Sequence, residues 1–111
     1  MEILRVAWLD ERGAGHILRL SPRRSGVTVD GRFRPLADPE LLLLTLLCRH
    51  ADQPVSRRNM LQALWGTSAP CVTRIADVYI QRLRNALPLL PLETVFRYGY
   101  VLHVFLLDDP S

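Results

Sequence analysis

TRIADVYIQRLRNAL, residues 73–87, has the apolar period of a packed helix. Thr73 can cap this helix at its start, and Pro88 with Pro91 ends it. At 100° per residue, one narrow arc of the helix holds Ala76, Ile80, Leu83 and Leu87, with Tyr79 at its border. This pattern predicts that one side of the helix is buried.

The opposite side of this helix is polar and rich in arginine. It holds Arg74, Val78, Gln81 and Asn85, with Arg82 on one flank and Asp77 and Arg84 on the other. Arginine can hydrogen-bond guanine, Gln and Asn can hydrogen-bond adenine, and a small apolar side chain can contact the methyl group of thymine. A solvated face with one exposed valine would also fit, so the helix alone leaves both interpretations open.

The first third of the chain predicts a small antiparallel sheet. Residues 3–9, ILRVAWL, and 16–20, HILRL, are interpreted as strands, with a glycine-containing break between them. In VTVDGRFRPL, residues 27–36, the pair Asp30-Gly31 lies between two extended arms. A two-residue type I′ turn needs positive φ at both positions, which Asp-Gly tolerates, so we expect a hairpin there.

Two further helices and a C-terminal hairpin complete the predicted order. Asp38 can cap LLLLTLLCRHA, whose leucines occupy nearly every side, so we expect the rest of the domain to wrap this helix. Ser56 can cap RRNMLQALW, which Gly66 ends. Residues 93–107 are rich in β-branched and aromatic residues and predict one or two hairpins. The expected fold class is α+β: a winged helix-turn-helix with an N-terminal antiparallel β-sheet, three helices and a C-terminal β-hairpin wing.

Length and composition favour one globular domain over residues 1–111. With 49% apolar residues, the chain can bury a core without metal or disulfides. The net charge of +3 favours an anionic partner. All 14 basic residues are arginine, which suits phosphates and guanine edges but also follows from a GC-rich genome. No apolar run is long enough to span a membrane, and the start is unlike a secretory signal, so we expect a cytoplasmic protein.

Nothing in the sequence predicts an enzyme, a cofactor or a metal site. Cys48 lies in an apolar helical run and Cys71 in an expected loop, without the spacing of zinc ligands, so both are interpreted as structural thiols. His16, His50 and His103 are scattered over separate elements. We find no Gly-rich phosphate cradle, no nucleophile beside a base and no clustered carboxylates.

Several motifs resemble the effector domain of OmpR/PhoB-type response regulators. The similarity spans about residues 17–104, and its most specific parts are PVSRRNMLQALWG, residues 54–66, and DVYIQRLR, residues 77–84. Residues 1–16 add an extra strand and turn, and residues 108–111 an acidic tail. The resemblance implies a sequence-specific DNA-binding transcriptional regulator. Helix 73–87 is then expected in the major groove and a wing over 94–104 near the minor groove.

The resemblance also implies roles for individual residues. Positions similar to Val78 and Arg82 contact bases in the major groove. The position similar to Gln81 lies along the phosphates in the family, but we also expect Gln81 to contact a base, because an amide can hydrogen-bond adenine. The residues expected along the phosphates are Thr73, Arg74, Tyr79, Arg84 and Trp65. Trp65 is equally compatible with a place in the core. Asp77 matches an acid that we expect to orient neighbouring arginines, because phosphates repel a carboxylate.

Three departures from the family pattern affect these expectations. The wing reads FRYGY over residues 96–100, which displaces its arginine by one position, and neighbouring strand residues point to opposite faces. Minor-groove insertion by Arg97, beside Tyr98, is therefore in question. Gln81 replaces a residue that is often basic. No receiver domain precedes the effector in this sequence, so we expect control by abundance, by a regulatory protein partner or by dimerisation through the N-terminal sheet instead of phosphorylation.

The expected partner is double-stranded DNA, bound by a homodimer on repeated half-sites about one helical turn apart. The loop over residues 67–71 is the candidate contact with RNA polymerase. The alternative is a protein-interaction module, an anti-activator or adaptor, that has lost or weakened DNA binding. The low net charge, Gln81 and the aromatic residues Phe96 and Tyr98 favour it. Salt separates the two hypotheses, because affinity that depends on phosphate neutralisation falls steeply with added salt.

Overall fold

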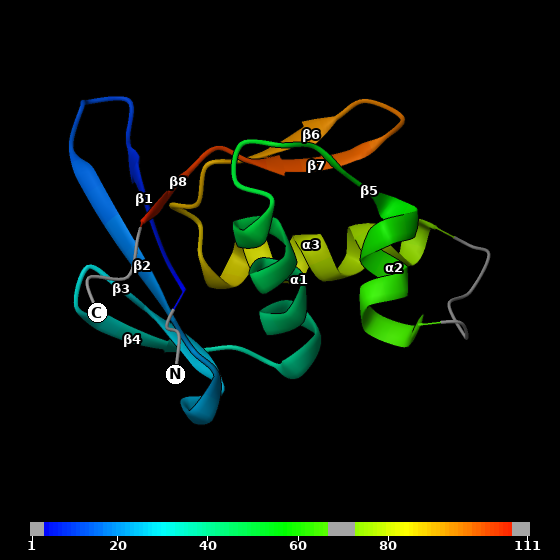
Figure 1. The fold of residues 1–111 in the computed structure, drawn as a ribbon, viewed down its shortest axis with the longest axis horizontal. Helices are drawn as coiled ribbons and strands as arrows, with labels where there is room; N and C mark the ends of the chain where they lie inside the picture. Colours follow the sequence, from blue (N-terminus) through cyan, green and yellow to red (C-terminus); the bar gives the residue numbers. More distant parts are fainter. Residues whose placement is uncertain (1–3, 67–72, 108–111) are drawn as a thin grey trace.

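The N-terminal third of the chain forms most of a five-stranded antiparallel sheet (Figure 1). The computed structural model describes residues 4–66 and 73–107. The sheet has the order β4-β3-β2-β1-β8, and its strands are β1 (Arg5–Leu9), β2 (Gly15–Ser21), β3 (Gly26–Val29), β4 (Arg32–Pro35) and β8 (Phe105–Leu107). The 3-10 helix η1 (Pro22–Arg24) connects β2 to β3.

The hairpin predicted at Asp30-Gly31 is confirmed. The φ angles of Asp30 and Gly31 are 51° and 83°, and Val29 pairs with Arg32 across the turn. Positive φ at both central positions gives the two-residue loop the twist that the flanking strands need. A local sequence signal is therefore sufficient to set the register of β3 against β4.

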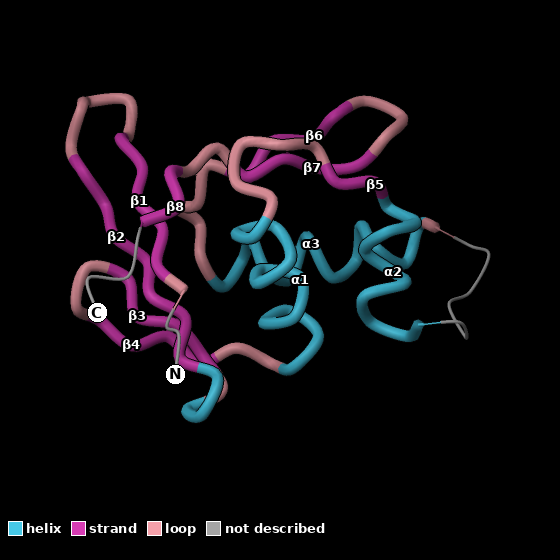
Figure 2. Tube along the Cα trace, in the orientation of Figure 1, coloured by secondary structure: helices cyan, strands magenta, loops and turns pink. Residues whose placement is uncertain are grey.

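The predicted C-terminal hairpin is confirmed, but the last strand was not predicted to join the N-terminal sheet. One hairpin forms, from β6 (Leu92–Val95) and β7 (Gly99–Leu102), and β5 (Val55–Ser56) pairs with β7 to give a three-stranded wing sheet (Figure 2). Strand β8 leaves the wing and pairs antiparallel with β1, with Val6 opposite Leu106. This pairing covers the open edge of β1, which a second wing hairpin would have left exposed.

Three helices lie beside the N-terminal sheet and below the wing sheet in Figure 1: α1 (Asp38–Arg49), α3 (Arg74–Ala86) and, at the end away from the N-terminal sheet, α2 (Arg57–Trp65). The capping of α2 is confirmed: the Ser56 hydroxyl accepts from the Asn59 amide at 3.1 Å, and Gly66 ends the helix. The capping of α1 is not, because Asp38 is already helical and Ala37 occupies the cap position without a side-chain bond. The acidic side chain lies in the first turn instead, where it complements the helix dipole.

The core lies where the three helices meet the inner faces of both sheets. Its largest fully buried side chains are Leu18, Leu43, Leu44, Leu47, Met60, Leu61, Ile80, Leu83 and Leu102. Wrapping of α1 is incomplete, since Leu42 is 49% exposed. Burial raises the pKa of the Cys48 thiol to about 12, as suits a structural thiol. No helix among the described residues is long and apolar enough to cross a membrane.

His16 joins two turns of the N-terminal sheet. Its Nδ1 lies 2.6 Å from Asp30 Oδ2 and its Nε2 lies 2.9 Å from Asp10 Oδ2, while its ring stacks on Trp8 at 5.3 Å. A neutral imidazole can donate only one of these hydrogen bonds, whereas the imidazolium donates both. The bonds to Asp30 and then Asp10 raise the pKa of His16 above its ordinary 6.5.

We therefore predict that the protein loses stability as the pH rises. Because the folded pKa is raised, the contribution of His16 is complete below pH 6.5 and disappears as the pH rises through the folded value. Bonds from His16 lower the pKa of Asp30 and of Asp10. Both carboxylates therefore stay ionised in mild acid, and the stabilisation by His16 persists there.

Denaturant unfolding of the wild type and of His16→Gln between pH 5.5 and 8.5 measures this effect. We expect the slope of unfolding free energy against pH to be shallower in the variant. His50→Gln is the control, since the side chain of His50 has no acidic partner among residues 4–66 and 73–107. Parallel pH curves for wild type and His16→Gln would contradict the prediction.

Candidate nucleic-acid interface

Helix α3 turns the predicted polar side outward. Ala76, Ile80 and Leu83 are fully buried, whereas Val78 is 50% exposed. Arg74, Gln81, Arg82 and Asn85 are all exposed. The apolar period of α3 thus predicted its orientation correctly, and the outward row is accessible to a large partner.

The outward row is partly organised by its own contacts. Gln81 Nε2 donates to Asn85 Oδ1 at 3.2 Å, four residues on. This bond links two amides that each retain a free donor or acceptor for a further partner. The predicted capping by Thr73 is wrong: Thr73 is exposed before α3 with helical φ and ψ, and its side chain makes no capping bond.

A surface stack of aromatic and basic side chains joins α2 to α3. The ring of Trp65 lies tilted against that of Tyr79 at 5.8 Å, and the guanidinium of Arg82 lies over the Tyr79 ring at 5.6 Å. Trp65 is 39% exposed, so it lies on the surface instead of in the core. Stacking restricts the Arg82 side chain while its guanidinium edge stays accessible.

Asp77 anchors α3 to α2 and to the wing. Its Oδ1 accepts from Arg57 Nε at 2.8 Å and also from the hydroxyl of Tyr100. Partial burial raises the pKa of Asp77, but the bonds from Tyr100 and Arg57 outweigh it and lower the pKa overall. Asp77 therefore stays ionised and orients Arg57, a partner that its expected role did not identify.

Arg84 lies at the junction of α3 with the wing. Its Nη2 donates to the Leu92 carbonyl and to Thr94 Oγ1, both at 3.1 Å, and its guanidinium lies 5.4 Å from the Tyr100 ring. Arg57 lies over the same ring at 5.3 Å. Neither Arg57 nor Tyr100 stands out in the sequence, because their contacts join segments far apart in the chain.

The wing tip carries three exposed side chains. Phe96 is 82% exposed and Tyr98 48% exposed, and the guanidinium of Arg97 lies 5.1 Å from the Phe96 ring. Arg97 has φ of 59°, and Tyr98 N donates to Val95 O at 3.0 Å to close the turn. Arg97 therefore lies in the turn and not in a strand as predicted, so the alternation of strand faces does not apply to it.

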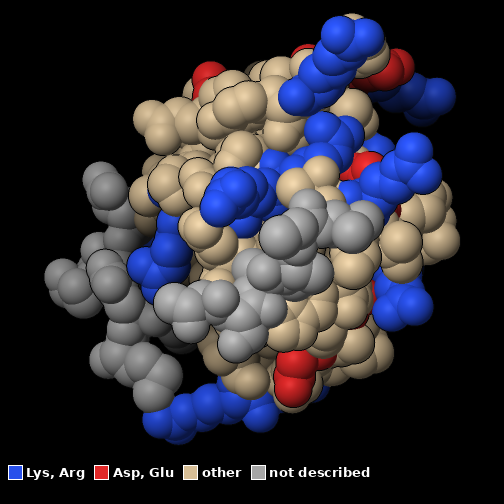
Figure 3. Space-filling view, turned by 90° about the vertical axis from the view of Figure 1, so that its right-hand side faces the viewer, with Lys and Arg blue, Asp and Glu red and all other residues tan. Residues whose placement is uncertain are grey.

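Arginine side chains gather at the end of the molecule that carries α2. Figure 3 shows several basic areas there, from the wing down across the helices, and fewer acidic ones. Arg58 is a further exposed basic residue, in the first turn of α2, and it was not among the predicted contact residues. Among the described residues, no group of three or more His, Cys, Asp or Glu side chains could hold a metal ion.

Comparison with known families assigns the fold. The model of the family described as transcriptional regulatory protein, C terminal, matches residues 32–102. The chain belongs to this family. Its members are the DNA-binding domains of OmpR/PhoB-type regulators and not enzymes, and the expected winged helix-turn-helix fold is confirmed.

Individual relatives agree with this assignment. The transcriptional regulatory protein CssR of Bacillus subtilis is 34% identical over 71 residues, which are 64% of this chain and 32% of that protein. The chain thus spans about a third of the length of the curated relatives it matches. The crystal structure of the CssR DNA-binding domain has a TM-score of 0.69 and 31% identity, and the match covers 77% of this chain and 98% of that one.

One similar structure contains DNA. The DNA-binding domain of Klebsiella pneumoniae RstA, solved in complex with the RstA box, has a TM-score of 0.68 and 28% identity. The match covers 78% of this winged-helix domain and 90% of that chain. The candidate contact with RNA polymerase, residues 67–71, lies outside the described residues.

Proposed function

We propose that this winged-helix domain binds double-stranded DNA with sequence specificity and regulates transcription. The observation that carries the proposal is the outward row of α3, which is exposed and bears Val78, Gln81 and Arg82. A helix fits the major groove, where arginine and amide side chains distinguish base pairs. A solved complex of the similar RstA domain with its DNA box supports the same partner.

In this proposal α3 lies in the major groove and the wing lies near the minor groove. Val78, Gln81 and Arg82 contact base edges. The residues placed along the phosphates are Thr73, Arg74, Tyr79, Trp65 and Arg84. The last of these has one nitrogen engaged by β6, so it binds phosphate with its remaining donors. Arg97 and Tyr98 project from the wing tip toward the neighbouring groove.

Two copies on repeated half-sites are required for tight binding, because one reading helix buries a modest area. We propose a head-to-tail homodimer on the DNA, acting in the cytoplasm, with RNA polymerase as a further partner. A regulatory protein partner then adjusts its activity.

A second candidate function is that of a protein-interaction module. Two observations favour it. Phe96 at the wing tip offers an exposed apolar side chain to a protein partner. The hydrogen bond from Gln81 to Asn85 occupies one donor and one acceptor that could otherwise bond to DNA bases. An apolar partner interface of this kind responds little to ionic strength.

Salt dependence decides between the two functions. We predict that affinity for a selected duplex falls steeply between 50 and 300 mM salt, with a slope of log K against log salt of about −3 for about three phosphates neutralised per domain. Fluorescence anisotropy with labelled duplexes, chosen first by selection from random sequences, measures the slope. Failure to enrich any duplex would reject the DNA-binding proposal in favour of the interaction module.

A further inference from the structure

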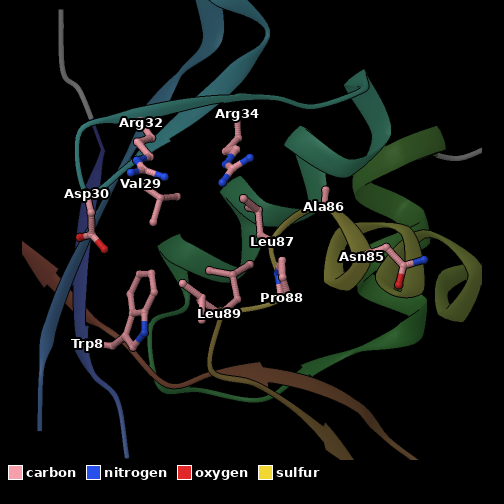
Figure 4. A pocket seen from close by; sticks show the side chains of 11 residues that line it. Trp8, Val29, Asp30, Arg32, Arg34, Asn85, Ala86, Leu87, Pro88 and Leu89 are labelled. Carbon is pink, nitrogen blue, oxygen red and sulfur yellow. The ribbon is translucent and has the colours of Figure 1, made fainter. Parts of the chain in front are cut away.

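A pocket of about 630 Å³ lies between the N-terminal sheet and the segment that follows α3 (Figure 4). One wall comes from β1, β3 and β4, and the other from residues 85–90. Its apolar surface includes Trp8, Val29, Leu87 and Leu89. Sites for small organic molecules have volumes of about 300–1,000 Å³ and similar apolar linings.

Two arginines from one strand bound the pocket. Arg32 and Arg34 are two residues apart on β4 and so lie on the same side of the strand. Figure 4 shows both guanidinium groups reaching from β4 toward the space above Trp8 and Leu89. Neither guanidinium group has an ion pair or hydrogen-bond partner among residues 4–66 and 73–107.

The acidic residue of the pocket does not neutralise these arginines. Asp30 Oδ2 lies 2.6 Å from His16 Nδ1, and Asp30 Oδ1 accepts from the Ile17 amide at 2.9 Å. Both of its oxygens are thus engaged by neighbours in the sheet. The unengaged charge at the pocket is positive, which favours an anion.

Trp8 supplies a third unengaged donor. Its side chain lines the pocket although the residue is only 3% exposed, and within the described part of the chain its indole N–H has no acceptor. This N–H is not among the buried side-chain polar atoms that lack a partner, so it is open to the pocket. A ligand with an acceptor group can therefore bond to it.

We propose that this pocket binds a small organic carboxylate. Its carboxylate group is held by Arg32 and Arg34, whose planar forks match that geometry. Its apolar body lies against Trp8, Leu87 and Leu89. A bare phosphate would leave this apolar surface uncovered. Asn85, at the end of the outward row of α3, also lines the pocket, so a ligand here lies beside the last turn of α3.

NMR titration of the full chain with naphthalene-2-carboxylate tests the proposal, with naphthalene-2-carboxamide as the uncharged analogue of the same shape. We expect the carboxylate to bind at least about tenfold more tightly than the amide, because only it pairs with the guanidinium groups. The indole N–H signal of Trp8 should shift, and that of Trp65, which does not line the pocket, should not.

Variants locate the site. Arg32→Gln combined with Arg34→Gln should weaken carboxylate binding about tenfold or more and leave amide binding unchanged. Arg49→Gln, an exposed arginine of α1 outside the pocket, is the matched control and should bind like the wild type.

Equal affinity for carboxylate and amide, absence of carboxylate binding, or shifts centred away from Trp8 would overturn the proposal. So would full carboxylate affinity in the double variant. The comparison of the two probes on the wild type remains decisive even if the double variant folds poorly. No DNA is present in this experiment, so its outcome is independent of the proposed DNA binding.

Discussion

Gly99→Ala is expected to destabilise the domain by at least about 3 kcal/mol, because the new methyl group has no space. A Cβ at Gly99 would lie 1.9 Å from the Val55 carbonyl oxygen and 2.9 Å from Ser56 Cα. Both are backbone atoms, which cannot move aside as a flexible side chain does. Strand β5 would have to separate from β7, where Ser56 pairs with Gly99.

The consequences reach the candidate interface. Ser56 caps α2, and the neighbouring Tyr100 pairs with Val55 and donates to Asp77 of α3. Displacement of β5 therefore disturbs the junction of α2, α3 and the wing. We expect the loss of DNA affinity to accompany the loss of stability.

Denaturant unfolding measured by circular dichroism gives the stability change, and Gly15→Ala is the matched control. A Cβ at Gly15 meets only Leu9 Cδ2, at 3.9 Å, which is ordinary contact. That variant should unfold within about 0.5 kcal/mol of the wild type. If both variants unfolded at the same denaturant concentration, the close approach of β5 to β7 would be refuted.

Features that depend on neighbouring residues could be predicted from the sequence. The Asp30-Gly31 turn needs only two positive φ angles, and the capping of α2 needs only Ser56 and the Asn59 amide. The orientation of α3 follows from its apolar period alone. Each of these features is decided within a few residues, where turn chemistry and helical geometry act.

Features that join distant segments could not be predicted in this way. The pairing of β8 with β1 brings Leu106 opposite Val6, and no local pattern distinguishes that pairing from a second wing hairpin. The contact between Arg57 and Asp77 spans 20 residues. Its partners are set by how α2 packs on α3, which a single sequence does not specify.

The role of Arg84 shows the same limit within one helix. Its place on the flank of α3 follows from the helical period, yet its bonds to Leu92 and Thr94 depend on where β6 lies. The helical period therefore predicts which way a side chain points, but not which neighbour from another element it meets. Arg97 is similar, because its turn conformation replaced the strand alternation that we expected.

Arg82→Ala is expected to weaken binding to the selected duplex by about 1–3 kcal/mol and to relax preference at one base pair. Arg82 is exposed on α3 and its guanidinium is positioned over Tyr79 at 5.6 Å. An arginine held in this way can donate two parallel bonds to guanine, and that pairing distinguishes the base. Its removal should therefore affect the selected sequence far more than a random one.

Arg74→Ala provides the contrast, because Arg74 begins α3 and is assigned to a phosphate. A phosphate contact carries no sequence information, so its loss should weaken binding to all duplexes alike and reduce the salt slope by about 1. Arg49→Ala on α1 controls for loss of charge alone. Anisotropy titrations of all three variants with selected and random duplexes separate the roles. Equal losses on both duplexes for Arg82→Ala would show that Arg82 contacts the DNA backbone and reads no base.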